Sequence, residues 1–305
     1  MKPLAVYTTV YPGVEAFLPD WLRSLRDQED DDFRLWIGLD AVTPEAVMEA
    51  MGGDPDATWV SALPGDTPGQ VRQRALERMV ESSIGVVLVD SDDVLHPNRV
   101  AWARDALTTS DLTACALRII DERGRDTGRT FGYAPDGTAD AVLPRNNIFG
   151  FSNSAYRSGI LQQCMPIPAS AELVDWFLAT VAWLHGARLA SDRRVGMDYR
   201  QHDANTARIL GPFTGRQVLK DTERVRHHFC LLWGLSVDGV APERLAELER
   251  ASADVEAFYR LVVLQPAHLE RYVRALNTLD FSPLWWACVA HPALRHLWAP
   301  ERSSA

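Results

Sequence analysis

The amino-acid sequence predicts an α/β protein with a mostly parallel central sheet flanked by helices and an α-helical C-terminal extension. Three observations lead to this fold class. Over the first 120 residues, short apolar runs rich in β-forming residues alternate with amphipathic helical patterns, as in successive βαβ units. The run IGVVLV at 84–89 is apolar without a break, which is typical of a strand covered on both faces. From about residue 211 onward, the apolar spacing is that of helices.

The first part of the chain alternates strands and helices in a regular order. We expect strands at 4–9, 33–39, 58–63, 84–89 and 112–120. Apolar residues at i, i+1, i+4, i+5 and i+8 predict an amphipathic helix over 17–25. Thr43-Pro44 and Thr67-Pro68 each place an N-capping residue before a proline, and each predicts the start of a further helix.

The pattern is looser in the middle of the chain and helical at its end. Residues 121–150 are rich in Gly, Asp, Arg and Pro, and we expect loops or a hairpin there. Ser170 is expected to cap a helix over about 172–185, which Gly186 would end. With a boundary near residue 210, the expected domains are 1–210, in halves of about 1–110 and 111–210, and a helical region 211–305.

Composition and charge argue against several classes of protein. The 305 residues carry 31 Lys and Arg against 41 Asp and Glu, a net charge of −10, and an acidic chain is not expected to bind nucleic acid. The four cysteines are widely spaced, which argues against a disulfide framework or a zinc site. No window approaches a membrane span of uninterrupted apolar residues. The beginning, MKPLAVYTTVYPG, is typical of a first strand and not of a signal peptide. We therefore expect a cytoplasmic protein.

The strongest chemical signal is the acidic run Asp-Ser-Asp-Asp at 90–93, directly after the apolar strand at 84–89. In open α/β sheets, ligands bind beyond the carboxyl ends of the strands. Carboxylates gathered there repel one another unless a cation lies among them, and Mg²⁺ or Mn²⁺ prefers such oxygen ligands. The alternative is a solvated acidic turn before the helix that follows Pro97.

Two families combine an apolar strand with an Asp-x-Asp motif of this kind. The nucleophile motif of the haloacid-dehalogenase-like phosphatases resembles VVLVDSDDVL at 86–95. That family places the motif near its N-terminus and follows it with a Lys and a GDxxxD-type acidic pair. Here about 85 residues precede the motif, Lys220 is the only later Lys, and no GDxxxD follows. The phosphatase is therefore the weaker hypothesis.

The chain is more similar to the family 2 glycosyltransferases of the GT-A fold, a Rossmann-like fold that transfers sugars from nucleotide-sugar donors. Thr-Val-Tyr at 9–11 resembles the S/T-x-Y turn of that family, and Ser24-Leu25 with Gln28 resembles its "SL..Q" helix. Asp40 ends the second strand, where the Asp that contacts the nucleoside base is found in the family.

The same resemblance continues through the third helix to the acidic run. The segment GQVRQRAL at 69–76 resembles the Gly-x-x-x-x-Arg opening of that helix in the family. Arg74 precedes Asp90 by 16 residues, as the family's spacing requires. The run at 90–93 is then the DxD element.

Further along, the family has an acidic catalytic motif, usually Glu-Asp, about 25 residues before Tyr-Arg-x-His. This chain has Val174-Asp175 and then Tyr-Arg-Gln-His at 199–202, with 25 residues between Asp175 and Arg200. Val174 replaces the Glu of the pair. Glu172, three residues before Asp175 on the expected helix, is a neighbour or a substitute for it. The resemblance covers roughly residues 4–207.

The resemblance implies a role for each matching residue. Asp92, with His202 as a further contact, would hold Mn²⁺ or Mg²⁺, and Asp175 would be the general base of an inverting transfer. The residues implied to bind the nucleotide sugar are Thr9, Tyr11, Asp40, Arg74, Asp90, Ser91 and Arg200. The alternative for Asp175 is an acidic residue that only stabilises a helix N-terminus.

The acceptor side is marked less clearly than the donor side. Phe151, Asn153 and Trp176 are the acceptor-binding candidates, with a core turn as the alternative for the first two and core packing for Trp176. The C-terminal segment FSPLWWACV at 281–289 contains two adjacent tryptophans. It is expected to be a helix packed against the catalytic domain, with a homodimer contact or a peripheral membrane contact as alternatives.

These features together predict a metal-dependent glycosyltransferase that moves a hexosyl or deoxyhexosyl group. The donor would be a UDP-, dTDP- or GDP-linked sugar, and the acceptor a glycan, a lipid-linked molecule or a small molecule. A second hypothesis is a catalytically silent domain of the same fold that binds a nucleotide sugar or a glycan. Val174 in place of the family's Glu is the feature that favours it.

Overall fold

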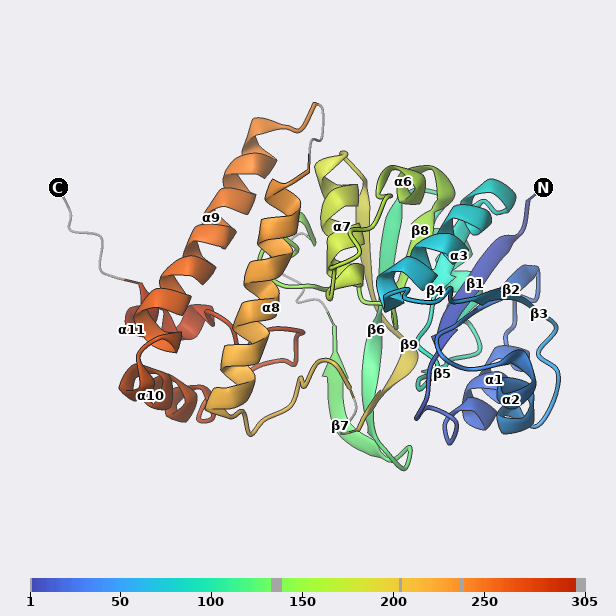
Figure 1. The fold of residues 1–305 in the computed structure, drawn as a ribbon, viewed down its shortest axis with the longest axis horizontal. Helices are drawn as coiled ribbons and strands as arrows, with labels where there is room; N and C mark the ends of the chain where they lie inside the picture. The colour runs from blue at the N-terminus through green and yellow to red at the C-terminus, as the bar shows by residue number, and fades with distance from the viewer. Residues whose placement is uncertain (1, 133–138, 203–204, 236–238, 300–305) are drawn as a thin grey trace.

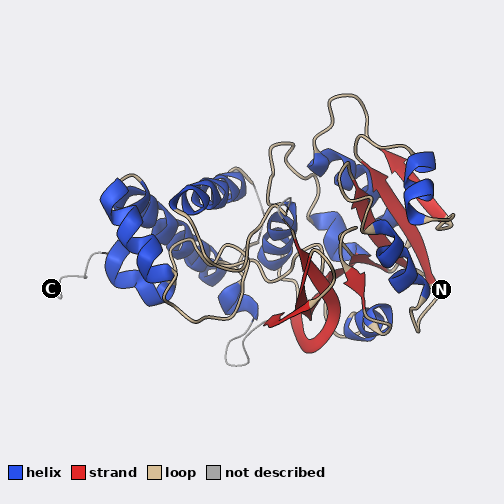
Figure 2. Cartoon of the chain, turned by 90° about the horizontal axis from the view of Figure 1, so that it is seen from below, coloured by secondary structure: helices blue, strands red, loops and turns tan. Residues whose placement is uncertain are grey.

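The strands form one nine-stranded sheet in the order β3-β2-β1-β4-β8-β6-β9-β5, with β7 paired to β6 outside this path. This is a computed structural model, which describes residues 2–132, 139–202, 205–235 and 239–299. Helices cover the sheet on both sides, and further helices form a separate layer at one end (Figures 1 and 2). The expected α/β fold class, with a helical C-terminal extension, is confirmed.

The N-terminal part of the sheet is fully parallel. Its strands are β1 (Leu4–Val10), β2 (Phe33–Leu39), β3 (Ala57–Ser61) and β4 (Gly85–Leu88). The helices between them are α1 (Leu18–Arg26), α2 (Pro44–Met51) and α3 (Pro68–Ser82). Every residue of β1 and β4 is buried, because helices pack on both faces of these central strands. The carboxyl ends of β1, β2 and β4 therefore meet at one edge of the sheet.

The helix starts expected from Thr43 and Thr67 are confirmed. The Thr43 side chain accepts a hydrogen bond from the Ala46 N–H. Thr67 and Gln70 form a reciprocal capping box at the start of α3, which satisfies two backbone donors that the helix itself leaves free.

Beyond β4 the sheet is mixed. The remaining strands are β5 (Val94–Leu95), β6 (Leu112–Asp121), β7 (Asp126–Phe131), β8 (Ser154–Arg157) and β9 (Leu189–Gln201). β8 is antiparallel to both β4 and β6, whereas β9 runs parallel to β6. β6 and β7 form a hairpin whose turn and second strand lie within 121–150, where loops or a hairpin were expected. The helices of this part are α4 (Arg99–Ala106), α5 (Ala139–Val142), α6 (Ser158–Gln163) and α7 (Val174–Leu184).

The expected cap of the seventh helix is wrong. α7 begins after Leu173, which makes no side-chain capping bond, so Ser170 lies three residues before the N-cap position. The Ser170 carbonyl oxygen instead lies 3.0 Å from the His227 ring. Gly186 has φ +85°, so the expected stop at the C-terminal end of α7 is confirmed.

The C-terminal region packs against α7 and the sheet edge. It contains α8 (Gly215–Trp233), α9 (Pro242–Phe258), a π-helical turn (Tyr259–Val263), α10 (Pro266–Leu276), a 3₁₀ turn (Pro292–Leu294) and α11 (Arg295–Trp298). Between α10 and the 3₁₀ turn, the segment 281–290 is irregular and not the expected helix. Trp286 and Ala290 have φ +62° and +46°, which no right-handed helix permits. Among the described helices, none is long and apolar enough to cross a membrane.

Candidate active site

A cavity of about 740 Å³ opens beyond the carboxyl ends of β1, β2 and β4, a size typical of small-molecule sites. One part of its lining follows these strands, and we call it the strand side: Thr9, Tyr11, Asp40, Asp90 and Asp92. Residues from later in the chain form what we call the opposite side, chiefly Phe151, Glu172, Asp175, Arg224 and Trp286.

The acidic run at 90–93 forms a tightly held turn after β4. The Ser91 hydroxyl donates to the Thr9 carbonyl oxygen at 2.9 Å, so Ser91 ties the turn to β1. Arg200 is buried and binds the turn twice: its Nε donates to the Asp92 carbonyl oxygen, and its backbone N–H donates to Asp93 Oδ1, both at 2.8 Å. Ser91 and Arg200 therefore position the aspartates, and neither lines the cavity.

The carboxylates of this turn are in an unfavourable environment for negative charge. Burial, followed by repulsion from Asp92, raises the pKa of Asp90 to about 7. The same two causes raise the pKa of Asp93 well above its usual range. Ser152 opposes the shift, because its hydroxyl donates to Asp90 Oδ2 at 2.8 Å. A bound cation would relieve this repulsion.

Asp92 and His202 are in direct contact. His202 Nε2 lies 2.7 Å from Asp92 Oδ2, and both side chains are buried. Phe17 packs against the His202 ring, with 5.0 Å between ring centroids. No group of three or more His, Cys, Asp or Glu side chains within the described residues could hold a metal ion on its own. The carboxylate and imidazole ligands present still suit Mn²⁺ or Mg²⁺, since these ions commonly take their remaining ligands from water and substrate phosphates.

The cation that α3 directs into the cavity is Arg72, not Arg74. Arg74 turns away from it, donating to the Ser61 carbonyl oxygen at 3.0 Å and pairing with Asp66 at 2.7 Å. Arg72 lines the cavity, and its guanidinium lies 4.3 Å from the centroid of the Phe151 ring. Its Nε is buried and has no hydrogen-bond partner in the described part of the chain.

Asp175 reaches the cavity from the first turn of α7. Its Oδ1 accepts the backbone N–H of Trp176 at 2.8 Å. Burial raises the pKa of the carboxyl, opposed by that N–H and by the positive charge of Arg72. A raised carboxyl pKa favours proton uptake at neutral pH. Glu172 also lines the cavity, but its side chain is 55% exposed and is paired with Arg224.

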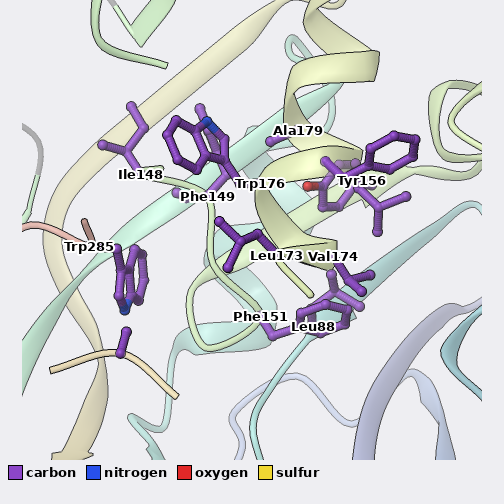
Figure 3. Close-up of a cluster of buried hydrophobic side chains, with 14 of the residues drawn as sticks. Leu88, Ile148, Phe149, Phe151, Tyr156, Leu173, Val174, Trp176, Ala179 and Trp285 are labelled. Atoms are coloured by element: carbon purple, nitrogen blue, oxygen red, sulfur yellow. The ribbon is translucent and has the colours of Figure 1, made fainter. Parts of the chain in front are cut away.

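Of the three acceptor-binding candidates, Phe151 lines the cavity and the other two do not. Asn153 is buried and holds its own turn: its Oδ1 accepts the Gly150 N–H, and its Nδ2 donates to the carbonyl oxygens of Cys115 and Ile148. Trp176 is also buried, and its Nε1 donates to the Leu143 carbonyl oxygen at 2.9 Å. Figure 3 shows Trp176 within the hydrophobic cluster, close to Phe149 and Ile148. Both residues are therefore better explained by packing.

The segment 281–290 supplies two cavity residues that the sequence did not assign to the site, Trp285 and Trp286. Trp285 Nε1 donates to the Tyr199 hydroxyl at 3.3 Å, and its ring centroid lies 4.0 Å from that of Phe131. The same indole fills the space beside Gly150, where a Cβ atom would come within 2.5 Å of it. Trp285 and Trp286 are buried within the chain and do not form an exposed patch.

Sequence reasoning also missed Arg72, Ser152 and Arg224. Arg72 could have been found as the first of the two basic residues in the segment at 69–76, since either one can face the cavity. Ser152 lies between the acceptor-binding candidates Phe151 and Asn153, but nothing in the sequence indicated its bond to Asp90. Arg224 stands on α8, and no motif connected that helix to the site.

Comparison with solved structures finds proteins of similar fold. A mannosyltransferase, PcManGT from Pyrobaculum calidifontis in complex with GDP-Man and Mn²⁺, aligns with a TM-score of 0.60 and 16% identity, over 92% of this chain and 77% of that chain. S. aureus TarS 1–349 in complex with UDP-GlcNAc aligns with a TM-score of 0.55 and 17% identity, over 90% of this chain and 88% of that chain. No protein-family model and no curated protein matches the sequence. At these identities the likeness establishes a shared fold.

Proposed function

We propose that the chain is a metal-dependent, inverting glycosyltransferase that moves a hexosyl or deoxyhexosyl group from a nucleotide-diphosphate sugar to a hydroxyl acceptor. The observation that carries the proposal is that one cavity is lined both by Asp90 and Asp92 of the acidic turn and by the half-buried carboxyl of Asp175. Residues 1–210 would form the catalytic part, and 211–305 would complete the cavity wall. The shared fold with structures that hold GDP-Man and UDP-GlcNAc supports this assignment.

In this proposal the donor binds along the strand side. Thr9, Tyr11 and Asp40 line the part of the cavity next to β1 and β2 and would contact the nucleoside. Arg72 takes the role that the sequence gave to Arg74, because its unpartnered Nε can donate to an anionic oxygen of the donor. A divalent cation held by Asp92, with Asp90 and His202 beside it, would supply neutralisation of the leaving diphosphate.

The transfer requires one bond to form and one to break. The acceptor hydroxyl oxygen bonds to the anomeric carbon, on the face opposite the diphosphate. The bond between that carbon and the diphosphate oxygen breaks, and its electron pair leaves with the nucleoside diphosphate. Asp175 takes the hydroxyl proton, for which its raised pKa is suited. Because the acceptor attacks directly, the configuration inverts and no covalent intermediate forms on the protein.

A silent nucleotide-sugar-binding domain is the second candidate, since Val174 stands where the related enzymes have Glu. The two candidates differ in turnover and not in binding. We would incubate the protein with UDP-, dTDP- and GDP-sugars, with and without Mn²⁺, and measure free nucleotide by chromatography. Metal-dependent nucleotide release that an acceptor stimulates supports the transferase. Donor binding in a thermal-shift screen without release from any donor supports the silent domain.

A further inference from the structure

Asn147, in the loop between α5 and β8, has an amide group that its own loop uses only in part. The side chain is buried, and its Oδ1 accepts the backbone N–H of Phe149 at 3.0 Å. Only the oxygen of an amide can accept that hydrogen, so this bond fixes the orientation of the group. The Nδ2 donor is then left buried without a hydrogen-bond partner in the described part of the chain. Buried donors without a partner are rare, and a catalytic role is one of the few reasons for keeping one.

The loop that carries Asn147 packs on the first turn of α7, next to Asp175. At the start of this loop, the carbonyl oxygen of Leu143 accepts the Trp176 Nε1–H at 2.9 Å. Figure 3 shows Phe149 of the same loop beside Trp176. Burial raises the pKa of the Asp175 carboxyl, and the Asn147 side chain is among the hydrogen-bonding groups that lower it. The amide of Asn147 is therefore adjacent to this carboxyl.

The same loop also reaches the acidic turn after β4. The Ser152 hydroxyl donates to Asp90 Oδ2 at 2.8 Å. Asn153 stiffens the loop, because its Oδ1 accepts the Gly150 N–H and its Nδ2 donates to the Ile148 carbonyl oxygen. One well-held loop therefore contacts a carboxyl group on each side of the cavity. A group-transfer site needs its reacting groups at fixed positions, and such a loop can provide them.

We propose that Asn147 is a positioning residue for Asp175, whose Nδ2 donates to the carboxylate and turns it toward the hydroxyl group of the acceptor. The inference rests on the proposed function and concerns how the base of that transfer is held. The Trp176 N–H binds Oδ1 of the same carboxylate. A carboxylate accepts about four hydrogen bonds, so these donors leave positions for the incoming proton. Catalytic hydrogen bonds often reach their shortest length only in the complex with substrate, and we expect the contact between Nδ2 and Asp175 to close there.

Charged and titratable groups face Asp175 from several elements packed around it. Burial raises the pKa of Asp175 and the charge of Arg72 lowers it, while the carboxyls of Asp90 and Asp175 repel each other. The groups concerned are Arg72 on α3, Asp90 after β4, Tyr156 on β8, Glu172 before α7, and Arg224 and His228 on α8. Exchange of Asn147 for another neutral residue alters none of these charges. A change in the titration of Asp175 can therefore be assigned to the lost amide.

The test compares two variants that both remove the amide. Asn147→Ser keeps a hydroxyl that can accept the Phe149 N–H, whereas Asn147→Leu has a similar volume but no polar group. The pKa of Asp175 is measured in the full chain by ¹³C NMR titration of its carboxyl carbon, which is assigned by comparison with Asp175→Asn. Both variants should raise this pKa by about 0.5 to 1, or about 3- to 10-fold in the protonation equilibrium, because the carboxylate loses a donor.

Turnover of the nucleotide sugar that the release assay selects provides the second readout. Because the base acts as a carboxylate, the acidic limb of the kcat–pH profile should move to higher pH by the same amount in both variants. Above this limb kcat should fall by about 3- to 10-fold, since a loosely held carboxylate is less often in the reactive geometry. The donor KM should stay within about 2-fold of that of the parent chain.

Asn146→Ser is the matched control, because it makes the same exchange at the preceding residue. Asn146 is half-buried, and its Nδ2 donates to the Trp285 carbonyl oxygen at 3.3 Å. This variant should leave both the pKa of Asp175 and the acidic limb of the profile unchanged. Circular dichroism shows whether each variant is folded; if Asn147→Leu is not, Asn147→Ser alone decides.

An unchanged Asp175 pKa in Asn147→Ser would overturn the inference. This holds even if the pKa rises in Asn147→Leu, because the lost Phe149 bond, and not the lost donor, would then be the cause. The inference and the proposed function can fail separately. Donor turnover by the parent chain with an unchanged pKa in the variants refutes only the role of Asn147. Absence of turnover with any nucleotide sugar refutes the transferase, and the NMR titration still decides whether Asn147 acts on Asp175.

Discussion

The strand side and the opposite side of the cavity are built in different ways. All residues of the strand side lie within the first 92 positions, either near the end of a parallel strand, as Thr9 does in β1, or within four residues after one. The opposite side combines a loop before β8, the beginning of α7, the middle of α8 and the irregular segment 281–290. The strand side is thus determined by sheet geometry, whereas the opposite side depends on how distant segments pack. The two sides should respond differently to substitution.

The largest expected effect is on the proposed base. Asp175→Asn keeps the shape of the side chain but removes its basicity, so kcat for transfer should fall by about 10²- to 10⁴-fold. Donor affinity with Mn²⁺, measured by calorimetry, should not change. Glu172→Gln is the matched control and should retain most of its kcat. If Glu172→Gln is inactive and Asp175→Asn is active, the base is Glu172.

A substitution on the strand side should affect metal-dependent nucleotide binding. Asp92→Asn removes the carboxylate that contacts His202 and should weaken Mn²⁺-dependent nucleotide binding by about 100-fold. Binding measured in EDTA should be the same for both proteins. Near-normal turnover of the variant at saturating Mn²⁺ would show that Asp92 is not a ligand.

A third effect concerns the stability of α8, the helix that carries Arg224 of the opposite side. His228 on α8 is buried, stacks on Trp176 with 4.3 Å between ring centroids, and has no hydrogen-bond partner within the described residues. Burial, with a smaller contribution from His227, lowers the pKa of His228 to about 3. The unfolded chain therefore binds a proton below pH 6.5 that the folded chain does not bind until about pH 3. Stability is lost as the pH falls through that window.

Urea unfolding at pH 7 and pH 5 measures this loss. His228 should account for about 2 kcal/mol of it, about 30-fold in the unfolding equilibrium. His228→Phe keeps an aromatic ring against Trp176 and removes the titration, so its stability should fall by about 2 kcal/mol less over the same interval. Equal losses in the two proteins would show that His228 is not buried in its neutral form.

The smallest effect separates two arginines of α3. Arg72→Ala should raise the donor KM by about 10-fold, because a charge-assisted bond to the donor is lost. Arg74→Ala, the matched control, should leave KM within about 2-fold and lower the free energy of unfolding by less than about 1 kcal/mol, the usual worth of a partly exposed ion pair. The reverse pattern would support the sequence-based prediction that Arg74, and not Arg72, binds the nucleotide sugar.

The sequence predicted the strand side well, because strand ends can be recognised from apolar runs that stop at polar residues. Asp40 and Asp90 each follow such a run directly. Arg72 and Arg74 show the limit of this reasoning. Residues two apart on a helix are related by a rotation of about 200° about its axis, so they point to nearly opposite sides. Only the packing of α3 decides which of the two arginines reaches the cavity.

The opposite side was less predictable for a related reason. Asn153 and Trp176 lie next to cavity residues in the sequence, but their side chains bond to the carbonyl oxygens of Cys115 and Leu143. Trp286 owes its position to a left-handed backbone, which no apolar pattern signals. Neighbours in sequence are a poor guide to the cavity wall wherever the chain is irregular.

The fit between Trp285 and Gly150 has a consequence for chimeric proteins built on this fold. The indole occupies the space of a missing Cβ, so the C-terminal region and the loop at 149–152 form one mechanical unit. A C-terminal region without a tryptophan at this position would leave a gap beside Gly150, and any larger residue at 150 would clash with Trp285. Exchange of this part of the cavity wall between proteins of this fold therefore has to transfer both segments together, although more than 100 residues of chain separate them.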